Sequence, residues 1–99
     1  MAGRTSKLDL PPMFNAASVE SIHERMKALL SGSNPIYIDF SRCKGVDAAG
    51  LQLLVAFVTA LQKENREFEL AGIEGEVLEA IELGGFGPSI GLPSDKAVA

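Results

Sequence analysis

The chain has 99 residues, 46% of them hydrophobic and 22% charged, which is enough for one globular domain with its own core. Its formal net charge is −4 and its lysines and arginines form no basic stripe, so nucleic acid and anionic membranes are poor candidate partners. The single cysteine, Cys43, cannot form an internal disulfide, which is typical of a cytoplasmic protein, and we expect neither a secretory signal nor a membrane span.

The first half of the chain predicts a strand, a helix and a second strand. Residues 7–10 alternate polar and apolar side chains before a pair of prolines, which predicts a short edge strand followed by a loop. Asn15 is a candidate N-cap for an amphipathic helix over residues 16–31, because the apolar side chains of that segment share one face. Residues 36–40 are rich in β-branched and aromatic side chains, which predicts an interior strand.

Asp47 precedes the most hydrophobic segment of the chain. Its carboxylate is expected to cap a helix by accepting a hydrogen bond from the backbone N–H of Ala49 or Gly50, and its charge suits the positive end of the helix dipole. Only two of the side chains in residues 51–61 are polar. We therefore expect this helix either to be covered on two sides or to bind a partner.

The second half of the chain predicts a crossover unit. Residues 68–73 favour a strand, and a strand, helix and strand joined by short loops form a right-handed unit whose strands are parallel. A third helix is expected to begin at Gly75, with Val77, Leu78 and Ile81 facing inward, and to end at Gly84-Gly85. Residues 86–92 leave room for a short edge strand, and residues 94–99 for a final turn.

Three segments, in this order, resemble the STAS domain family. They are Ile36-Tyr37-Ile38-Asp39-Phe40-Ser41, Val46-Asp47-Ala48-Ala49-Gly50-Leu51 and Phe68-Glu69-Leu70-Ala71-Gly72. The resemblance implies an α/β fold with a mixed, mostly parallel sheet of about four strands packed by about four helices. It places the domain over residues 7–92, with flexible termini at residues 1–6 and 93–99. Because members usually begin with a hairpin for which this chain has little room, we expect a sheet one strand short.

The STAS family includes bacterial anti-sigma factor antagonists, other signalling proteins and the cytoplasmic tails of anion transporters. The resemblance therefore implies a non-enzymatic, cytoplasmic interaction module in bacterial signalling, with an anti-sigma factor of the histidine-kinase-like type or another regulator as its protein partner. The start Leu8-Asp9-Leu10-Pro11-Pro12 also resembles small STAS proteins encoded beside chemotaxis genes. The alternative is a structural STAS subunit of a phospholipid or anion transporter complex. The resemblance specifies no oligomeric state.

Residue 48 departs from the family pattern. STAS domains of this kind usually carry Ser or Thr there, and a partner kinase phosphorylates its hydroxyl, which adds about two negative charges at a helix N-terminus and alters docking. The matching residue is Ala48, and Ala49 follows it, so neither side chain can accept a phosphate. Either the sequence carries a substitution that freezes the unmodified state, or its subfamily does not use the switch. Ser41 and Thr59, the nearest hydroxyls, are poorly placed replacements.

The expected docking surface combines the helix start with the segments at the same end of the sheet. It comprises Ser41, Asp47, Ala48, Ala49, Gly50 and Gln52, together with Met13 and Phe14 from the neighbouring loop. The small side chains of Ala48 and Ala49 would let the backbone of a partner approach closely.

Catalytic chemistry finds little support in the sequence. A nucleophile and base pair would require the only histidine, His23, to meet Cys43, and His23 is better interpreted as a solvated helix residue. The ligand spacings of a metal site do not occur. The glutamates at residues 74–82 are interpreted as a solvated helix face, and Gly84-Gly85-Phe86-Gly87 as a helix end and turn and not a phosphate loop. We therefore expect no catalytic residues, no metal and no cofactor.

Overall fold

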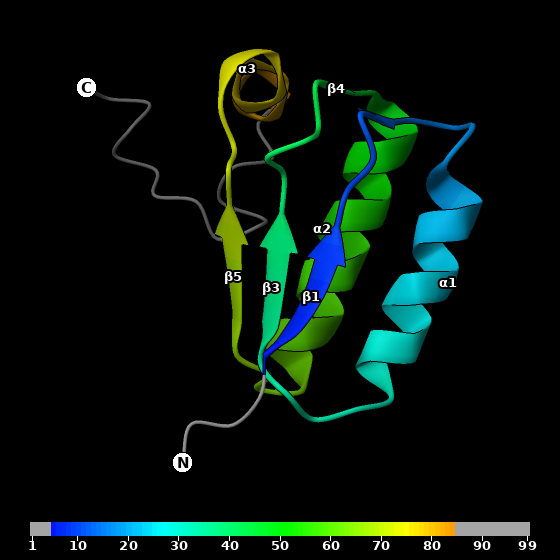
Figure 1. Cartoon of the computed structure of the whole chain (residues 1–99), viewed down its shortest axis with the longest axis vertical. Coiled ribbons are helices and arrows are strands. Elements are labelled where there is room, and N and C mark those ends of the chain that lie inside the picture. Colours follow the sequence, from blue (N-terminus) through cyan, green and yellow to red (C-terminus); the bar gives the residue numbers. More distant parts are fainter. Residues whose placement is uncertain (1–4, 85–99) are drawn as a thin grey trace.

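The computed structural model of the chain describes residues 5–84. Three parallel strands form its main sheet (Figure 1). They are β1 (Ser6–Asp9), β3 (Ile36–Asp39) and β5 (Phe68–Ala71), hydrogen-bonded in the order β1-β3-β5. The predicted central position of residues 36–40 and their parallel pairing with the strand after the hydrophobic helix are both confirmed.

Two helices cover one face of this sheet (Figure 1). They are α1 (Val19–Leu30) and α2 (Ala48–Lys63), which also pack against each other. In β3 the side chains of Ile36 and Ile38 are buried, whereas those of Tyr37 and Asp39 are only partly so, because successive residues of a strand point to opposite faces. The buried face of the sheet thus meets the apolar sides of the helices.

The hydrophobic helix predicted after Asp47 is α2, and the first of the two alternatives holds, since the main sheet and α1 both cover it. Leu54, Val58 and Leu61 are fully buried in the core. Leu53 and Phe57 line the junction with α1. Its apolar residues are therefore largely accounted for by the packing of this chain on itself.

The start of α1 differs from the prediction, because the helix begins at Val19 and not at residue 16. The preceding residues form a turn that side chains hold. Asn15 Oδ1 accepts a hydrogen bond from the Ala17 N–H at 3.0 Å, and Ser18 Oγ accepts one from the Asn15 N–H at 3.1 Å. Such side-chain bonds to local backbone compete with helix formation, which explains the later start.

A second, two-stranded sheet was not predicted. β2 (Met13–Phe14) pairs in parallel with β4 (Gly45–Val46), just beyond the carboxyl ends of β1 and β3. Residues 5–84 thus contain five strands in two parallel sheets and three helices, where the sequence predicted about four of each. The α/β class and the parallel pairing are as predicted.

The third helix, α3 (Gly75–Leu83), lies at the carboxyl end of the main sheet and contacts β4 (Figure 1). Val77 and Ile81 are buried, as predicted, and Leu78 is half-buried. The helix ends before Gly84, also as predicted. The strand predicted over residues 86–92 and the turn over residues 94–99 lie outside the described residues.

Candidate functional site

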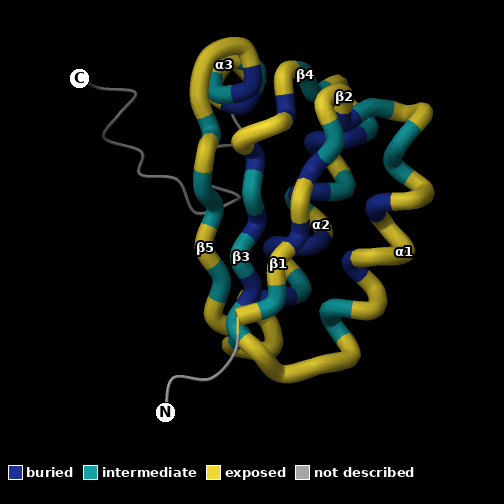
Figure 2. The backbone as a smooth tube through the Cα atoms, viewed as in Figure 1, coloured by how far each residue is buried: buried dark blue, intermediate teal, exposed yellow. Residues whose placement is uncertain are grey.

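The structure gathers the predicted docking residues at the carboxyl ends of the parallel strands. Figure 2 shows β2, β4 and α3 together at this edge of the sheet. Because α2 starts directly after β4, its N-terminus opens at the same edge. We call this region the loop edge, and it comprises the short sheet of β2 and β4, the first turn of α2, and α3.

Asp47 fixes the geometry of the loop edge. Its Oδ1 accepts a hydrogen bond from the Gly50 N–H at 3.0 Å, so the predicted N-cap is present, with Gly50 as the donor. Its Oδ2 accepts a bond from the Ala16 N–H at 3.3 Å, and its own N–H donates to the Phe14 carbonyl at 3.2 Å. One residue therefore joins the start of α2 to β2 and to the turn before α1.

Gly50 is buried where α2 crosses closely over β2. A Cβ atom at this position would overlap the Phe14 carbonyl oxygen and lie 3.0 Å from Cγ2 of Val46. The absence of a side chain is thus what permits the close approach. Gly50 supports the loop edge from inside and offers no surface to a partner.

The other expected docking residues differ in their accessibility. Ser41, Asp47, Ala48 and Gln52 are exposed, Ala49 is half-buried, and Met13 is 53% exposed. Phe14 is fully buried in the core, so its side chain cannot contact a partner in this structure. Phe14 contributes its side chain to the core, and its backbone carbonyl accepts the hydrogen bond from the Asp47 N–H.

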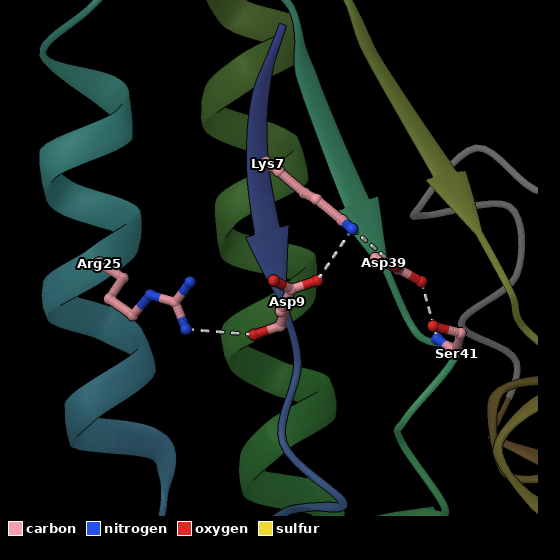
Figure 3. Close-up of polar contacts among 5 residues, drawn as sticks. All are labelled: Lys7, Asp9, Arg25, Asp39 and Ser41. Carbon is pink, nitrogen blue, oxygen red and sulfur yellow. Dashed lines mark hydrogen bonds and ion pairs between the residues drawn. The ribbon is translucent and has the colours of Figure 1, made fainter.

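A polar cluster next to Ser41 was not predicted (Figure 3). Asp39 Oδ1 accepts a hydrogen bond from the Ser41 N–H at 2.8 Å, and Lys7 Nζ lies 3.3 Å from Asp39 Oδ2 and 3.5 Å from Asp9 Oδ1. Hydrogen bonding from Ser41, aided by Lys7, lowers the pKa of Asp39. The hydrogen bond to Asp39 and the charge of Asp9 raise the pKa of Lys7. The alternating pattern of β1 and β3 was the signal that could have placed these side chains on one face.

The single cysteine belongs to the core. Cys43 is 8% exposed, and its Sγ lies 3.4 Å from the Gly45 carbonyl oxygen, to which it donates. Burial raises the pKa of the thiol, which disfavours the reactive thiolate. His23 is exposed on α1 and lines the junction with α2. Within residues 5–84, no three His, Cys, Asp or Glu side chains converge in a way that could hold a metal ion.

A family model described as "Mlab, STAS domain" matches residues 1–92. The chain belongs to the STAS domain family. The resemblance inferred from the three segments is thereby confirmed. None of the helices in residues 5–84 combines the length and the apolar character needed to span a bilayer.

Solved structures show the same STAS fold. A sulfate transporter family protein from Wolinella succinogenes is 19% identical, with a TM-score of 0.72 over 88% of this chain and 71% of that one. The Bacillus cell fate determinant SpoIIAA in its phosphorylated form is also 19% identical, with a TM-score of 0.67 over 99% of this chain and 91% of that one. At this identity the likeness concerns the fold alone. No curated protein matches the chain.

Proposed function

We propose that this STAS domain is a non-enzymatic interaction module of bacterial cytoplasmic signalling, related to anti-sigma factor antagonists. It binds a histidine-kinase-like regulator or another signalling protein through the accessible side chains of residues 46–52, with Ser41 and Met13 at the border of the contact. The observation that supports this proposal is the exposure of Ala48 at the start of α2. Ala48 is the first residue of the helix, next to a cap whose carboxylate and N–H hold three other segments.

The same position defines how the module differs from phosphorylated relatives. The matching hydroxyl of the family pattern is replaced by the methyl group of Ala48, so phosphate cannot be attached there. Binding is then regulated by the amount of free protein and not by modification of this residue. The similarity to SpoIIAA, whose structure was solved in the phosphorylated form, makes this difference testable.

The test uses a purified anti-sigma factor kinase encoded near the gene, together with ATP. We expect a complex with the wild-type domain and no phosphate on it by mass spectrometry. A48D is expected to weaken the complex at least tenfold while remaining folded, because a carboxylate in the first turn of a helix is favourable. T59D, which places the same charge further along α2 on an exposed position, is the control and is expected to bind normally.

Two results would contradict the proposal. Phosphate found on any residue would show that a switch is present after all. Equal affinity of the wild type and A48D would place the docking surface away from residues 46–52.

A structural subunit of a transporter complex is the second candidate. The matching family description and the similarity to a sulfate transporter family protein favour it. Co-purification of the tagged domain with a membrane ATPase from detergent-solubilised membranes would select this candidate over a soluble kinase. A chemotaxis array, suggested by the sequence of residues 8–12, is a third setting that the neighbouring genes would identify.

A further inference from the structure

A groove that is partly apolar and partly acidic runs along the loop edge between β4 and α3. Met13, 53% exposed, and Leu83, 82% exposed, are the large hydrophobic side chains that stand out into solvent within residues 5–84. Gly45 connects them, because it lines this groove together with Leu83 and lies close to the Met13 side chain; we call Met13, Gly45, Val46 and Leu83 the strip. Gly45, Val46 and Leu83 line a groove of about 330 Å³, and a Cβ on Gly45 would lie 3.0 Å from Cε of Met13. The glycine therefore lets the Met13 side chain lie close against the floor of the strip.

The wall that α3 contributes to this groove is acidic. Glu76 and Glu79 line it together with Ala80. α3 contains no lysine or arginine, and the ion pairs found within residues 5–84 involve neither of these glutamates. Lys44 lies in the adjoining hollow with Glu74 and Glu76, outside the groove itself. An occupant thus meets an apolar floor and two carboxylates, and no lysine or arginine of residues 5–84 lines the groove.

We propose that this groove binds a basic, amphipathic segment of the protein partner. One apolar side chain of that segment lies on Val46 and Leu83, and neighbouring lysines or arginines reach Glu76 and Glu79. The inference rests on the proposed function, because β4 leads directly into the first turn of α2 and one partner can cover both. It adds the chemistry of the partner, which the docking surface at residues 46–52 does not specify.

The negative charge of Glu76 and Glu79 determines which kind of segment the groove can bind. An acidic segment would be repelled by the two carboxylates, as would a nucleic acid, since like charges brought together at an interface are unfavourable. A neutral apolar segment would fill the strip but leave both carboxylates without partners in a contact that excludes water. A segment with both apolar and basic side chains can pack on the apolar floor and pair with the carboxylates of the wall at the same time.

The experiment is a selection of random 12-residue peptides, displayed on phage, against the wild-type protein with counter-selection against L83S. Leu83 is so exposed that its replacement leaves the core untouched. We expect the enriched peptides to combine an apolar residue with at least two lysines or arginines. Their affinity should fall at least tenfold for L83S and at least threefold for E76Q/E79Q, and should weaken with added salt.

The control is E20Q/E64Q, which removes two carboxylates that are exposed on other elements and so matches the change in net charge. It is expected to bind the selected peptides within twofold of the wild type. Peptides without basic residues, peptides that bind L83S equally, or the failure to enrich any peptide that distinguishes the two proteins would overturn the inference.

The variant A48D separates this inference from the proposed function. If the kinase complex is lost with A48D but unaffected by L83S and E76Q/E79Q, residues 46–52 dock the partner and the groove does not. If the groove variants lower the affinity of the complex and A48D does not, the groove is the docking site and the proposed contact at the helix start is wrong.

Discussion

The carboxylate of Asp47 has two structural roles, of which its sequence position indicated one. A cap for α2 could be predicted, because an acidic residue directly precedes an apolar helical segment. The bond from Oδ2 to the Ala16 N–H could not, since it joins residues 31 positions apart and depends on how the turn before α1 folds. The side chain is therefore both a local cap and a link between distant segments.

Removal of this carboxylate tests both roles. We expect D47A to lower the free energy of unfolding by about 1–2 kcal/mol, the upper part of the range for lost N-caps, because two backbone N–H groups lose their acceptor. D47N keeps one amide oxygen and should lose less. Urea unfolding at pH 7 measures the difference, and a D47A variant as stable as the wild type would show that solvent replaces both bonds.

The carboxyl group of Asp39 makes the free energy of unfolding depend on pH. Because its pKa is lowered in the folded protein, its contribution is complete above the pKa of an unfolded aspartate, about 3.9, and is lost as the pH falls through the folded value. The stability difference between the wild type and D39N is therefore expected to be largest near neutral pH and to shrink below about pH 4. Urea unfolding from pH 7 to pH 2.5 checks this.

The control for that series is D9N. Asp9 lies near the same lysine but receives no hydrogen bond from Ser41. A D39N difference that stays constant over the whole pH range would mean that the carboxylate is not stabilised in the folded state.

At the scale of elements, the close crossing of α2 over β2 depends on Gly50. Replacement of a glycine inside a helix by alanine normally stabilises a protein, by about 0.5–1 kcal/mol. Here we expect the opposite sign, with G50A destabilising by about 1–3 kcal/mol, since the new methyl group meets the Phe14 backbone and not a flexible side chain. The A49G variant is the matched comparison. It introduces the ordinary cost of a glycine in a helix at the residue next to the crossing.

Thermal unfolding of both variants provides the measurement. A G50A variant more stable than the wild type would show that α2 can move away from β2 without loss of packing. In that case the rigid presentation of Ala48, which begins the same turn of helix, would also be in doubt.

The sequence predicted long elements better than short ones. β3 and α2 carry patterns that extend over several residues, and their types and order were right. β2 and β4 have two residues each, too few for a period, and they form only because the loops after β1 and β3 lie side by side. The start of α1 was missed because the side chains of Asn15 and Ser18 favour a turn.

The site followed the same rule. The cap at Asp47 and the helix start at Ala48 could be predicted from the sequence, whereas their contact with a partner stays a prediction. The burial of Phe14 and the exposure of Leu83 could not, since each depends on which faces the short sheet and α3 present after packing. An apolar residue at the end of a helix has the same sequence signature whether it lies in the core or in solvent.

At the scale of the whole molecule, Cys43 reports whether the loop edge opens independently of the core. Its side chain belongs to the same buried cluster as residues from the main sheet, α1 and α2, yet it lies only two residues before β4. Because burial raises its pKa, the thiolate is disfavoured in the folded protein, and the free energy of unfolding is expected to fall as the pH rises above the unfolded pKa of about 8.5.

We therefore expect the thiol to react slowly with Ellman's reagent at pH 7 in the native protein and at once in the unfolded protein. As urea is added, the rate should follow the unfolded fraction measured by circular dichroism, because exposure of Cys43 then requires the core to open. A fast rate that does not change with urea would mean that β4 separates from β2 by local opening. A partner would then meet a mobile edge, and the preformed groove between β4 and α3 could not be the surface that selects it.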